Sequence, residues 1–385
     1  MNEASTEALE ELLGKPEKRI PYSGMLELTR LCSLKCTHCY LGDARWQRDA
    51  DELSTAEAKT VMDVLAAEGT LWLFITGGEP LIRRDFREIW RYGVEKGFLL
   101  TLFTNATLID AAMADFLAEN PPLKIEISIY GATKATYERV TLIPGSYERF
   151  LRGVEFLREK KLPCELKTVL LKENFYEVDD MRAMAREWGM VLSTDGAIQA
   201  STGEGKTSGL APCASRAPLE RVVEIELADK YYRKDMTRNF HQKSENAQAG
   251  MLFGCGAGKD SFYVSSRGYL QMCSATTYRG ESLRKNPSMA GAFKQAWKNF
   301  GEIRKIKMDP KSPCQSCDIA YLCQNCPAYA FLETGNEQAP VEWLCQLTHS
   351  KARALNLPHV CRPDHFCRPE PAALRASEFG DPGRN

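Results

Sequence analysis

The stretch MLELTRLCSLKCTHCY, residues 25–40, decides the fold of this chain. Its first five residues form a short apolar run that predicts a β-strand. The loop that follows carries Cys32, Cys36 and Cys39, and an aromatic residue, Tyr40, comes directly after the third cysteine. Three thiolates cannot fill the four corners of a four-iron cluster, so one iron is left open for an outside ligand, as a reactive metal site requires. We therefore predict an iron–sulfur site in the loop after the first strand.

Around this stretch, the chain alternates between short apolar runs and amphipathic helical segments as far as about residue 199. Strands are predicted at 25–29, 71–76, 99–104, 123–129, 165–171 and 190–194. Crossover helices between successive strands imply parallel pairing with right-handed connections. We predict an α/β fold built on a partial (β/α)6 barrel of TIM type, although an open parallel sheet also fits the periodicity. In parallel barrels the catalytic groups lie at the C-terminal ends of the strands.

Capping residues mark where the helices begin and end. Ser54 and Glu57 form the pattern of a capping box, and Gly69 is placed to end the helix that they begin. Further predicted ends are the N-caps Asp110 and Ser146 and the terminator Gly189. These signals set the helix boundaries independently of the apolar pattern.

The composition excludes several classes of function. The chain has 385 residues, 44% of them hydrophobic and 26% charged, with a net charge of −1. This balance offers neither a basic surface for nucleic acid nor a polybasic membrane anchor. No apolar run reaches the length of about 18 residues that a membrane helix needs. The first 15 residues are acidic and polar, unlike a secretory signal, so we expect a cytoplasmic protein that binds neither nucleic acid nor membrane.

Fourteen cysteines are unusual for a protein of the reducing cytoplasm, where disulfides are disfavoured. A cysteine cluster in that compartment binds metal or performs redox chemistry. Only five histidines occur, and none is spaced with a CxxC pair as zinc ligands are. Most thiolates must therefore bind a metal group together with other thiolates, which favours iron–sulfur clusters.

Changes of composition divide the chain. We expect an N-terminal segment (1–20), the barrel (21–212), a charged and partly helical bridge (213–253), a cysteine-rich domain (254–350) and a tail rich in Pro and Arg (351–385). The segment between the barrel and the bridge is rich in Gly, Ser and Pro and predicts a loop.

Polar residues follow the predicted strands. The second strand ends in the sequence GGEP, residues 77–80, which on its own predicts a tight turn. Thr104 and Asn105 follow the third strand, Ser128 stands near the end of the fourth, and Lys167 lies within the fifth. Asn and Ser at strand ends are also ordinary turn residues, and Lys167 is either an inward-facing polar group or a solvated side chain.

The CxxxCxxC spacing followed by an aromatic residue, together with GGEP, resembles the radical S-adenosylmethionine (SAM) superfamily. The resemblance implies that Cys32, Cys36 and Cys39 hold a [4Fe–4S] cluster whose open iron binds SAM. An electron from that cluster then breaks a sulfur–carbon bond of SAM to give a 5′-deoxyadenosyl radical. The residues that the resemblance assigns to the SAM site are Tyr40, Gly77, Gly78, Glu79, Pro80, Asn105 and Ser128. Glu79 is expected to pair with the methionine ammonium. A zinc knuckle and a plain turn are the alternatives for the two motifs.

The second half of the chain contains its own cysteine pattern. Its members are Cys255, Cys273, Cys314, Cys317, Cys323, Cys326 and Cys345. This pattern resembles the SPASM extension of radical SAM enzymes, which houses auxiliary [4Fe–4S] clusters, and implies three clusters in all. The spacing departs from the family between Cys323 and Cys326, which are separated by two residues where three are usual. A zinc ribbon is the alternative, because CxxC pairs also suit four-coordinate zinc.

The resemblance also implies how the auxiliary ligands are shared. One cluster is expected to have the complete ligand set Cys314, Cys317, Cys323 and Cys345. The other would be held by Cys255, Cys273 and Cys326, with one iron lacking a thiolate. Asp260, Cys213 or a tail cysteine (Cys361 or Cys367) could complete it, or the position stays open.

Members of the family with this two-part layout mostly modify peptides or proteins. The resemblance therefore implies a peptide or protein substrate and a reductant protein such as flavodoxin or ferredoxin. Only about 20 residues precede the barrel, so a separate leader-recognition protein is expected. Two alternatives stay open: an enzyme that modifies a small molecule, such as a tetrapyrrole, and a multi-cluster electron carrier. An electron carrier would favour fully ligated clusters, unlike the three-cysteine loop.

Overall fold

The computed structural model describes residues 19–42, 49–202, 212–242, 250–285, 287–323 and 326–359. The first half contains β1 (Ser23–Glu27), α2 (Thr55–Ala67), β2 (Trp72–Thr76), α3 (Phe86–Glu95), β3 (Leu99–Thr104), α4 (Ala111–Glu119), β4 (Lys124–Ser128), α5 (Lys134–Thr141), α6 (Ser146–Glu159), β5 (Cys164–Val169), α7 (Val178–Glu187) and β6 (Leu192–Asp195). The second half contains α8 (Leu219–Ala228), α9 (Lys230–Gln242), β7 (Ser261–Val264), β8 (Tyr269–Gln271), β9 (Glu281–Ser282), α10 (Met289–Ile303), α11 (Pro327–Thr334) and α12 (Glu342–Ala354). The N-terminal segment and the cysteines Cys361 and Cys367 lie outside these ranges.

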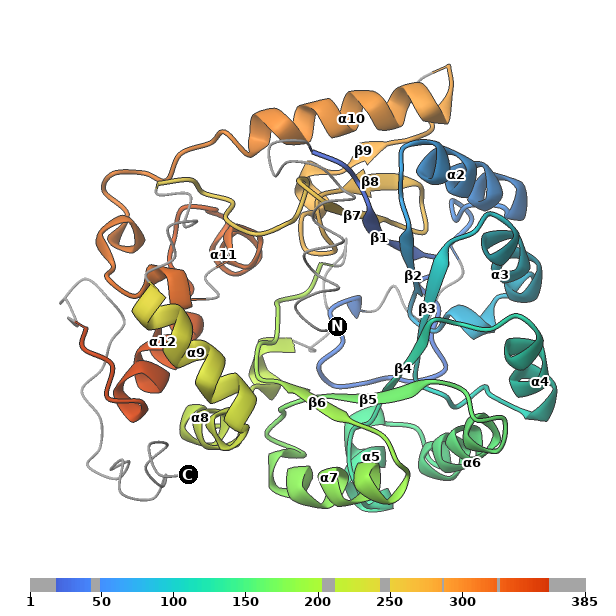
Figure 1. Cartoon of the computed structure of the whole chain (residues 1–385), viewed down its shortest axis with the longest axis horizontal. Helices are drawn as coiled ribbons and strands as arrows, with labels where there is room; N and C mark the ends of the chain where they lie inside the picture. Colours follow the sequence, from blue (N-terminus) through green and yellow to red (C-terminus); the bar gives the residue numbers. More distant parts are fainter. Residues whose placement is uncertain are drawn as a thin grey trace.

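All six predicted barrel strands are present, and each pairs in parallel with the next along the chain. The strand order of the whole sheet is β6-β5-β4-β3-β2-β1-β7-β8-β9, so β6 and β9 are its two edges. Figure 1 shows β1–β6 as a curved sheet with helices α2–α7 around its outer side. The prediction of a partial (β/α)6 barrel is confirmed, because the sheet curves without closing.

The strands alternate between an apolar outer face and a polar inner face. In β4, Ile125 and Ile127 are fully buried beneath the helices, while Glu126 and Ser128 point the other way. Lys124 Nζ contacts Glu126 Oε1 at 2.9 Å and Glu165 Oε2 at 2.7 Å across the inner face. The interior of this barrel is therefore lined with paired charges, unlike the apolar centre of a closed TIM barrel.

Most predicted helix ends are confirmed. Ser54 and Glu57 form the capping box of α2, and the Asp110 side chain accepts a hydrogen bond from the Met113 amide. The prediction for Ser146 was wrong. Ser146 is the first residue of α6, whose N-cap is Gly145 at φ 74°, and its hydroxyl bonds to that of Thr141 at 2.8 Å. A glycine occupies the cap because the chain enters α6 through a left-handed conformation that serine rarely adopts.

The sheet continues from the barrel into the second half of the chain, which the sequence did not predict. β7 pairs in parallel with β1, and β8 and β9 follow it antiparallel. Gly24 in β1 makes this pairing possible: a Cβ there would meet the Phe262 ring of β7 at 2.1 Å. The close approach seals the junction of the two halves, so that the cysteine-rich part is an extension of the same sheet.

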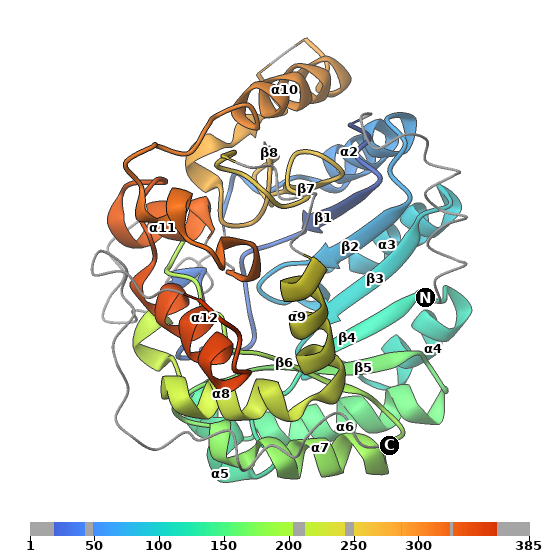
Figure 2. The same cartoon turned by 60° about the vertical axis from the view of Figure 1, so that its left-hand side comes forward.

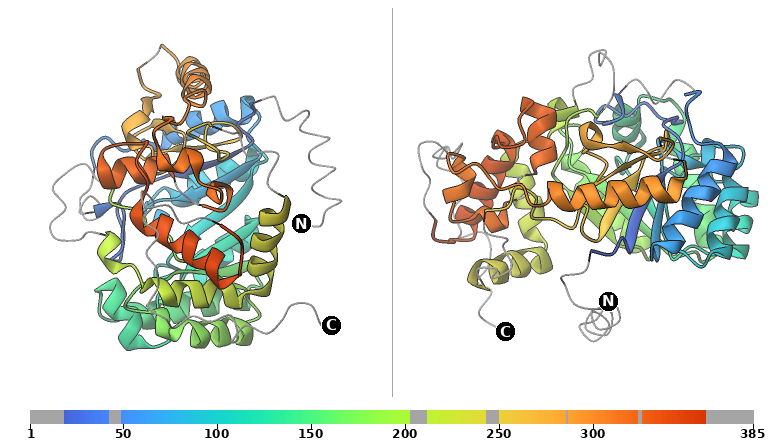
Figure 3. Two further views of the ribbon diagram at one scale, coloured as in Figure 1. Left: turned by 90° about the vertical axis from the view of Figure 1, so that its left-hand side faces the viewer. Right: turned by 90° about the horizontal axis from the view of Figure 1, so that it is seen from above.

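Whereas α10 packs against α2 and β9, three other C-terminal helices, α8, α9 and α12, pack beside the β6 edge. Figure 2 shows α8, α9 and α12 as neighbouring helices on that side, and Figure 3 shows α12 on the opposite side of the molecule from α2. A buried ion pair between Glu226 of α8 and Lys351 of α12 joins two of them. The boundary expected at residue 350 falls inside α12. Among the helices that the structure describes, none combines the length and apolar character needed to cross a membrane.

Candidate active site

A cavity of about 440 Å³ opens at the C-terminal ends of the barrel strands. Its lining includes the residues Cys32, Cys36, His38, Cys39, Tyr40, Thr76, Gly77, Gly78, Phe103, Thr104, Asn105, Ser128, Tyr130, Lys167, Ser193, Thr194 and Asp195. The structure thus brings together one loop after β1 and the ends of β2 to β6. This volume lies within the range of about 300–1,000 Å³ that small-molecule sites occupy.

The cysteine loop is fixed by backbone contacts. The Leu34 amide donates to Cys32 Sγ at 3.4 Å, and the Cys39 amide donates to the Cys36 carbonyl at 3.2 Å. The amides of Lys35 and Thr37 bond to the carbonyls of the last two residues of α5, at 2.9 and 3.0 Å. These bonds hold the three thiol side chains at one wall of the cavity.

The glycine turn after β2 is bonded to the segment that leads into the cysteine loop. The Gly78 amide donates to the Thr29 carbonyl and the Glu79 amide to the Leu31 carbonyl, both at 2.8 Å. A Cβ at Gly78 would lie 2.4 Å from the carbonyl oxygens of Arg30 and Leu31. Glycine is therefore required here because two backbone segments touch, and the turn sets the position of the cysteine loop.

Glu79 differs from the expectation that its carboxylate holds the methionine ammonium. Its side chain is completely buried, and neither Glu79 nor Pro80 is among the cavity lining. The carboxylate accepts hydrogen bonds from Thr104 Oγ1 (2.9 Å), the Asn105 amide (2.8 Å) and the Leu81 amide (3.2 Å). Burial raises its pKa to about 7, although these hydrogen bonds oppose the shift. The Glu79 carboxylate therefore links the turn after β2 to the end of β3 without lining the cavity.

Asn105 and Ser128 both line the cavity, as the sequence predicted. The side-chain amide of Asn105, however, already has hydrogen-bond partners within the protein. It donates to Ser33 Oγ at 3.2 Å and to Cys32 Sγ at 3.7 Å, and its oxygen accepts from Thr107 Oγ1 at 2.7 Å. Asn105 therefore supports the cysteine loop, and its N–H group points at a sulfur.

Two more predicted residues border the cavity. Tyr40 lies on its wall, and the Tyr40 carbonyl accepts a hydrogen bond from the Thr202 amide at 2.8 Å. Burial raises the pKa of the Tyr40 hydroxyl. Lys167 lines the cavity from β5, forms an ion pair with Glu126, and leaves 46% of its side chain exposed, so it has features of both alternatives.

Several residues that line the cavity were not predicted from the sequence. Phe103, Tyr130 and the run Ser193, Thr194 and Asp195 at the end of β6 all face the cavity. The run of three polar residues that ends the last strand is the one signal that could have revealed them. Tyr130 and Phe103 could not be distinguished from core residues, because an aromatic side chain at a strand end usually packs inside.

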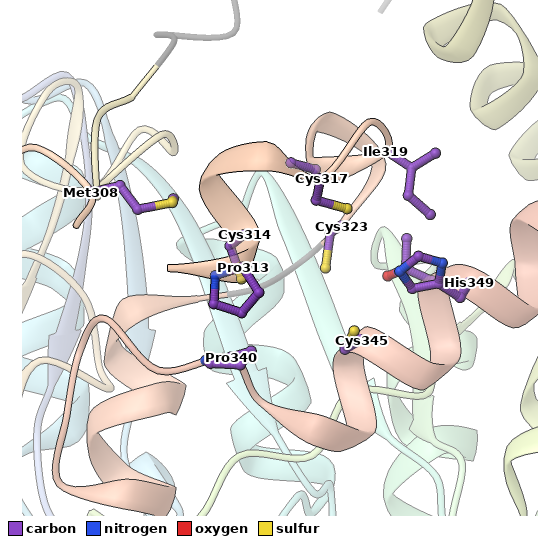
Figure 4. A pocket seen from close by; sticks show the side chains of 11 residues that line it. Met308, Pro313, Cys314, Cys317, Ile319, Cys323, Pro340, Cys345 and His349 are labelled. Atoms are coloured by element: carbon purple, nitrogen blue, oxygen red, sulfur yellow. The ribbon is translucent and has the colours of Figure 1, made fainter. Parts of the chain in front are cut away.

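The C-terminal cysteines form two groups. Cys314, Cys317, Cys323 and Cys345 surround a cavity of about 80 Å³. Figure 4 shows the four side chains converging on this space, with Cys345 coming from α12 and the other three from the loops before α11. The structure therefore brings together the four cysteines expected to share one cluster.

The second group contains Cys255, Cys273 and Cys326. Burial, together with smaller effects of the neighbouring Cys273 and Cys255, raises the pKa of the Cys326 thiol to about 11. Cys213 Sγ donates to the Ile198 carbonyl oxygen at 3.9 Å.

The Asp260 carboxylate, proposed from the sequence as a further ligand, folds over Gly256, where an added Cβ would meet its oxygen at 2.3 Å. The fourth ligand of the group of three stays a prediction, with Asp260 and Cys213 among its candidates.

Comparisons with known proteins agree with this geometry. Residues 26–185 match the model of the Radical SAM superfamily. The chain is 30% identical to the AdoMet-dependent heme synthase of Methanosarcina barkeri, over 80% of this chain and 92% of that protein. It is 26% identical to the PqqA peptide cyclase of Bradyrhizobium diazoefficiens, over 82% of this chain and 84% of that protein.

Among solved structures, the fold resembles that of Streptococcus suis SuiB bound to S-adenosylmethionine, with a TM-score of 0.65 and 16% identity over 90% of this chain and 84% of that one. This likeness shows a shared architecture of barrel and C-terminal extension. Together with the family match and the full-length relatives, it leads to one conclusion: the chain is an enzyme that belongs to the radical SAM superfamily.

Proposed function

We propose that this enzyme cleaves SAM reductively in the 440 Å³ cavity and uses the resulting radical to abstract hydrogen from a peptide or protein substrate. The observation that carries the proposal is the arrangement of Cys32, Cys36 and Cys39 on one wall of a cavity at the strand ends. Membership of the family implies SAM and a [4Fe–4S] cluster as cofactors. The donor set fits them, because three thiols leave one iron coordination position open.

When bound at these thiolates, the cluster supplies the electron that splits SAM into methionine and a 5′-deoxyadenosyl radical. The chain itself orients the reactants. The Asn105 N–H group near Cys32 Sγ would stabilise a thiolate ligand and tune the cluster. Gly77 and Gly78 bring backbone to the cavity wall, where no side chain blocks the methionine group. Ser128 and Tyr130 line another part of the wall of the same cavity.

We further propose two auxiliary [4Fe–4S] clusters, which makes three clusters in the protein. The convergence of Cys314, Cys317, Cys323 and Cys345 in Figure 4 supports one of them. The proximity of Cys273 and Cys255 to Cys326 supports the other, and its fourth ligand is left open. A stoichiometric zinc content would contradict this proposal in favour of a zinc ribbon.

The peptide substrate is supported by the relative that is named as a peptide cyclase. Polar groups for such a substrate line the β5–β6 side of the cavity, where Lys167, Ser193 and Asp195 face the cysteine loop. A protein reductant such as flavodoxin or ferredoxin would supply the electron, and a separate leader-recognition protein would deliver the peptide.

The test is anaerobic incubation of the reconstituted enzyme with SAM, dithionite and a short peptide encoded beside its gene. We expect 5′-deoxyadenosine together with a change in peptide mass that requires both SAM and reductant. Omission of SAM is the control. Formation of 5′-deoxyadenosine without any change in peptides would contradict the peptide substrate while leaving SAM cleavage intact.

A second candidate is modification of a tetrapyrrole. The specific observation in its favour is the 30% identity, across 92% of its length, to a protein named as a heme synthase. Incubation with an iron porphyrin that bears propionate groups separates the two functions. Loss of mass from the porphyrin, with no response to peptides, would favour this candidate.

A further inference from the structure

A second cavity of about 400 Å³ lies beside the proposed SAM cavity, and the two share Tyr40 and Leu41 as a common wall. This second cavity is lined by the end of β1 and the segment after it, the β7–β8 hairpin and one residue of α11, Leu332. Figure 1 shows β7 and β8 beside β1, so the cavity belongs to the junction of the two halves of the sheet. None of the residues that we assign to the iron sites lines it.

Arg30 is the first notable group in this cavity. It is half-buried, and its backbone amide donates to Glu52 Oε1 at 2.9 Å. Within the described part of the chain, no acidic side chain forms an ion pair with the Arg30 guanidinium. A half-buried guanidinium without an ion-pair partner can bind a carboxylate through two parallel hydrogen bonds.

The acids around Arg30 are already engaged. Glu27 lines the cavity, but its carboxylate accepts hydrogen bonds from the Tyr263 hydroxyl, the Ser266 amide (3.0 Å) and the Ser266 hydroxyl (2.6 Å). Asp49 forms an ion pair with Arg267, which is the other arginine of the cavity. Arg30 therefore lies near carboxylates that are hydrogen-bonded to other groups, and it forms an ion pair with none of the described acids.

Gln271 gives a second and independent sign that a ligand is bound here. It lies on β8 and lines the cavity with only 5% of its surface exposed. Its Oε1 atom is buried and has no hydrogen-bond partner among the described residues. A buried amide oxygen without a donor costs about 1–3 kcal/mol, and a small shift of the side chain toward a ligand N–H or O–H group in the cavity would recover it.

We propose that this cavity, the carboxylate chamber, holds a carboxylate of the substrate on Arg30 while Gln271 pairs with a neighbouring amide group. An acidic residue of a peptide offers both, because its side-chain carboxylate is a few bonds from a backbone N–H. The hydroxyls of Ser265, Ser274 and Thr277 line the same cavity and can donate to the second carboxylate oxygen. The inference rests on the proposed function and names the substrate as an anionic one.

The position of the chamber gives it a role in orientation. It adjoins the SAM cavity across Tyr40, the residue directly after the last cysteine of the loop. A substrate anchored by its carboxylate on Arg30 would extend past Tyr40 toward the radical. Fixed anchoring at one end reduces the entropy lost in bringing the reacting atoms together.

Two matched pools of ten-residue peptides with capped ends test the chamber. One pool carries Asp or Glu at varied positions, and the other carries Asn or Gln at the same positions. Both are incubated with the anaerobic holoenzyme and SAM, and bound peptides are quantified by mass spectrometry. We expect at least tenfold enrichment of the acidic pool by the wild type and loss of that preference in Arg30→Gln. Arg30→Lys should keep part of the preference, because a lysine retains the charge without the bidentate geometry.

Arg84→Gln is the matched control, because Arg84 is an exposed arginine outside the chamber, and it should behave as the wild type. Gln271→Leu should weaken binding of both pools. A parallel arm replaces the peptides with coproporphyrin III and its tetramethyl ester, to distinguish a propionate from an acidic residue. Arg30-dependent binding of the free acid in that arm alone would support the chamber and overturn the peptide as the source of the carboxylate.

Equal binding of acidic and amide forms by the wild type in both arms would overturn the chamber, as would an undiminished acidic preference in Arg30→Gln. Iron content of each variant shows whether it has folded, and Arg30→Lys provides a second variant should Arg30→Gln lose its iron. Failure of the proposed function is separate: it is recognised by the absence of 5′-deoxyadenosine from the wild type, whatever the peptides do.

Discussion

The carboxylate of Glu79 lies behind the glycine turn and bonds to Thr104, Asn105 and Leu81. The sequence shows that residue 79 is a glutamate within GGEP, but it does not show in which direction the side chain points. Turn residues at strand ends can face the cavity or the neighbouring strand, and only the register of β2 against β3 decides between them. The same limit applies to Asn105, whose amide supports Cys32 and Ser33.

Glu79→Gln tests whether Glu79 positions the turn or binds SAM directly. All three partners donate hydrogen bonds to the Glu79 carboxylate, so an amide N–H₂ in place of one oxygen would face an N–H donor. We expect the free energy of unfolding to fall by about 1–3 kcal/mol at pH 6. A direct ligand of SAM would instead lose SAM affinity with unchanged stability in urea unfolding.

The raised pKa of Glu79 also predicts how the stability difference between wild type and Glu79→Gln changes with pH. The pKa of Glu79 is raised from 4.5 to about 7, so the folded state holds this proton more tightly than the unfolded state. The associated stability is complete below about pH 4.5 and is lost as pH rises through 7. Because glutamine does not titrate, the stability gap between wild type and Glu79→Gln should narrow from pH 6 to pH 8. A gap that widens over this range would contradict the pKa shift.

At the scale of elements, two close backbone approaches organise the site. Gly78 allows the β2 turn to rest on the segment before the cysteine loop. Gly24 allows β7 to pair with β1. The alternation of strands and helices predicted β1 to β6 because each has an apolar run and a crossover helix. β7 was missed because its four residues follow a glycine-rich loop without a helix, and its pairing partner is more than 200 residues earlier.

Gly78→Ala should push the turn after β2 away from the segment that leads into the cysteine loop. The added methyl would lie 2.4 Å from two backbone oxygens, which cannot move as a flexible side chain can. We expect SAM affinity to fall at least tenfold, equivalent to about 1.4 kcal/mol, with a changed spectrum of the SAM-binding cluster. Equilibrium dialysis and electron paramagnetic resonance would measure the two effects. Unchanged SAM affinity would show that the contact between the loops has no part in binding.

Gly24→Ala should loosen the junction between barrel and C-terminal half. Its methyl would overlap the Phe262 ring, and overpacking of this kind costs about 1–3 kcal/mol. Limited proteolysis should cut faster near β7 in this variant than in wild type. Gly254→Ala is the control, because no atom lies within 4 Å of a Cβ at that position. Equal effects of the two substitutions would argue against the packing explanation.

For the whole molecule, one nine-stranded sheet joins the barrel strands, which carry the proposed radical site, to β7–β9 of the second half. The apolar pattern predicted the barrel, whereas the division of the C-terminal cysteines into two groups was an expectation from the family resemblance. The sequence could not predict the carboxylate chamber, which is formed where β1 meets β7 and combines Arg30 with Gln271 from opposite halves of the chain. Long-range pairing of this kind leaves no local periodic signal.

The iron content should reflect three independent sites. We expect about twelve irons in the reconstituted wild type and about eight after Cys32, Cys36 and Cys39 are replaced with alanine, because each [4Fe–4S] cluster carries four. Elemental analysis that also measures zinc would check the count. Four irons with one stoichiometric zinc in the triple variant would contradict the pair of auxiliary clusters.

The central claim is that Cys32, Cys36 and Cys39 hold the cluster that cleaves SAM. It is tested most directly by measuring 5′-deoxyadenosine from the triple alanine variant, incubated anaerobically with SAM and dithionite after reconstitution. The account predicts that wild type forms 5′-deoxyadenosine and that the triple variant forms none while retaining its auxiliary iron. Formation of 5′-deoxyadenosine by the triple variant at the wild-type rate would contradict it.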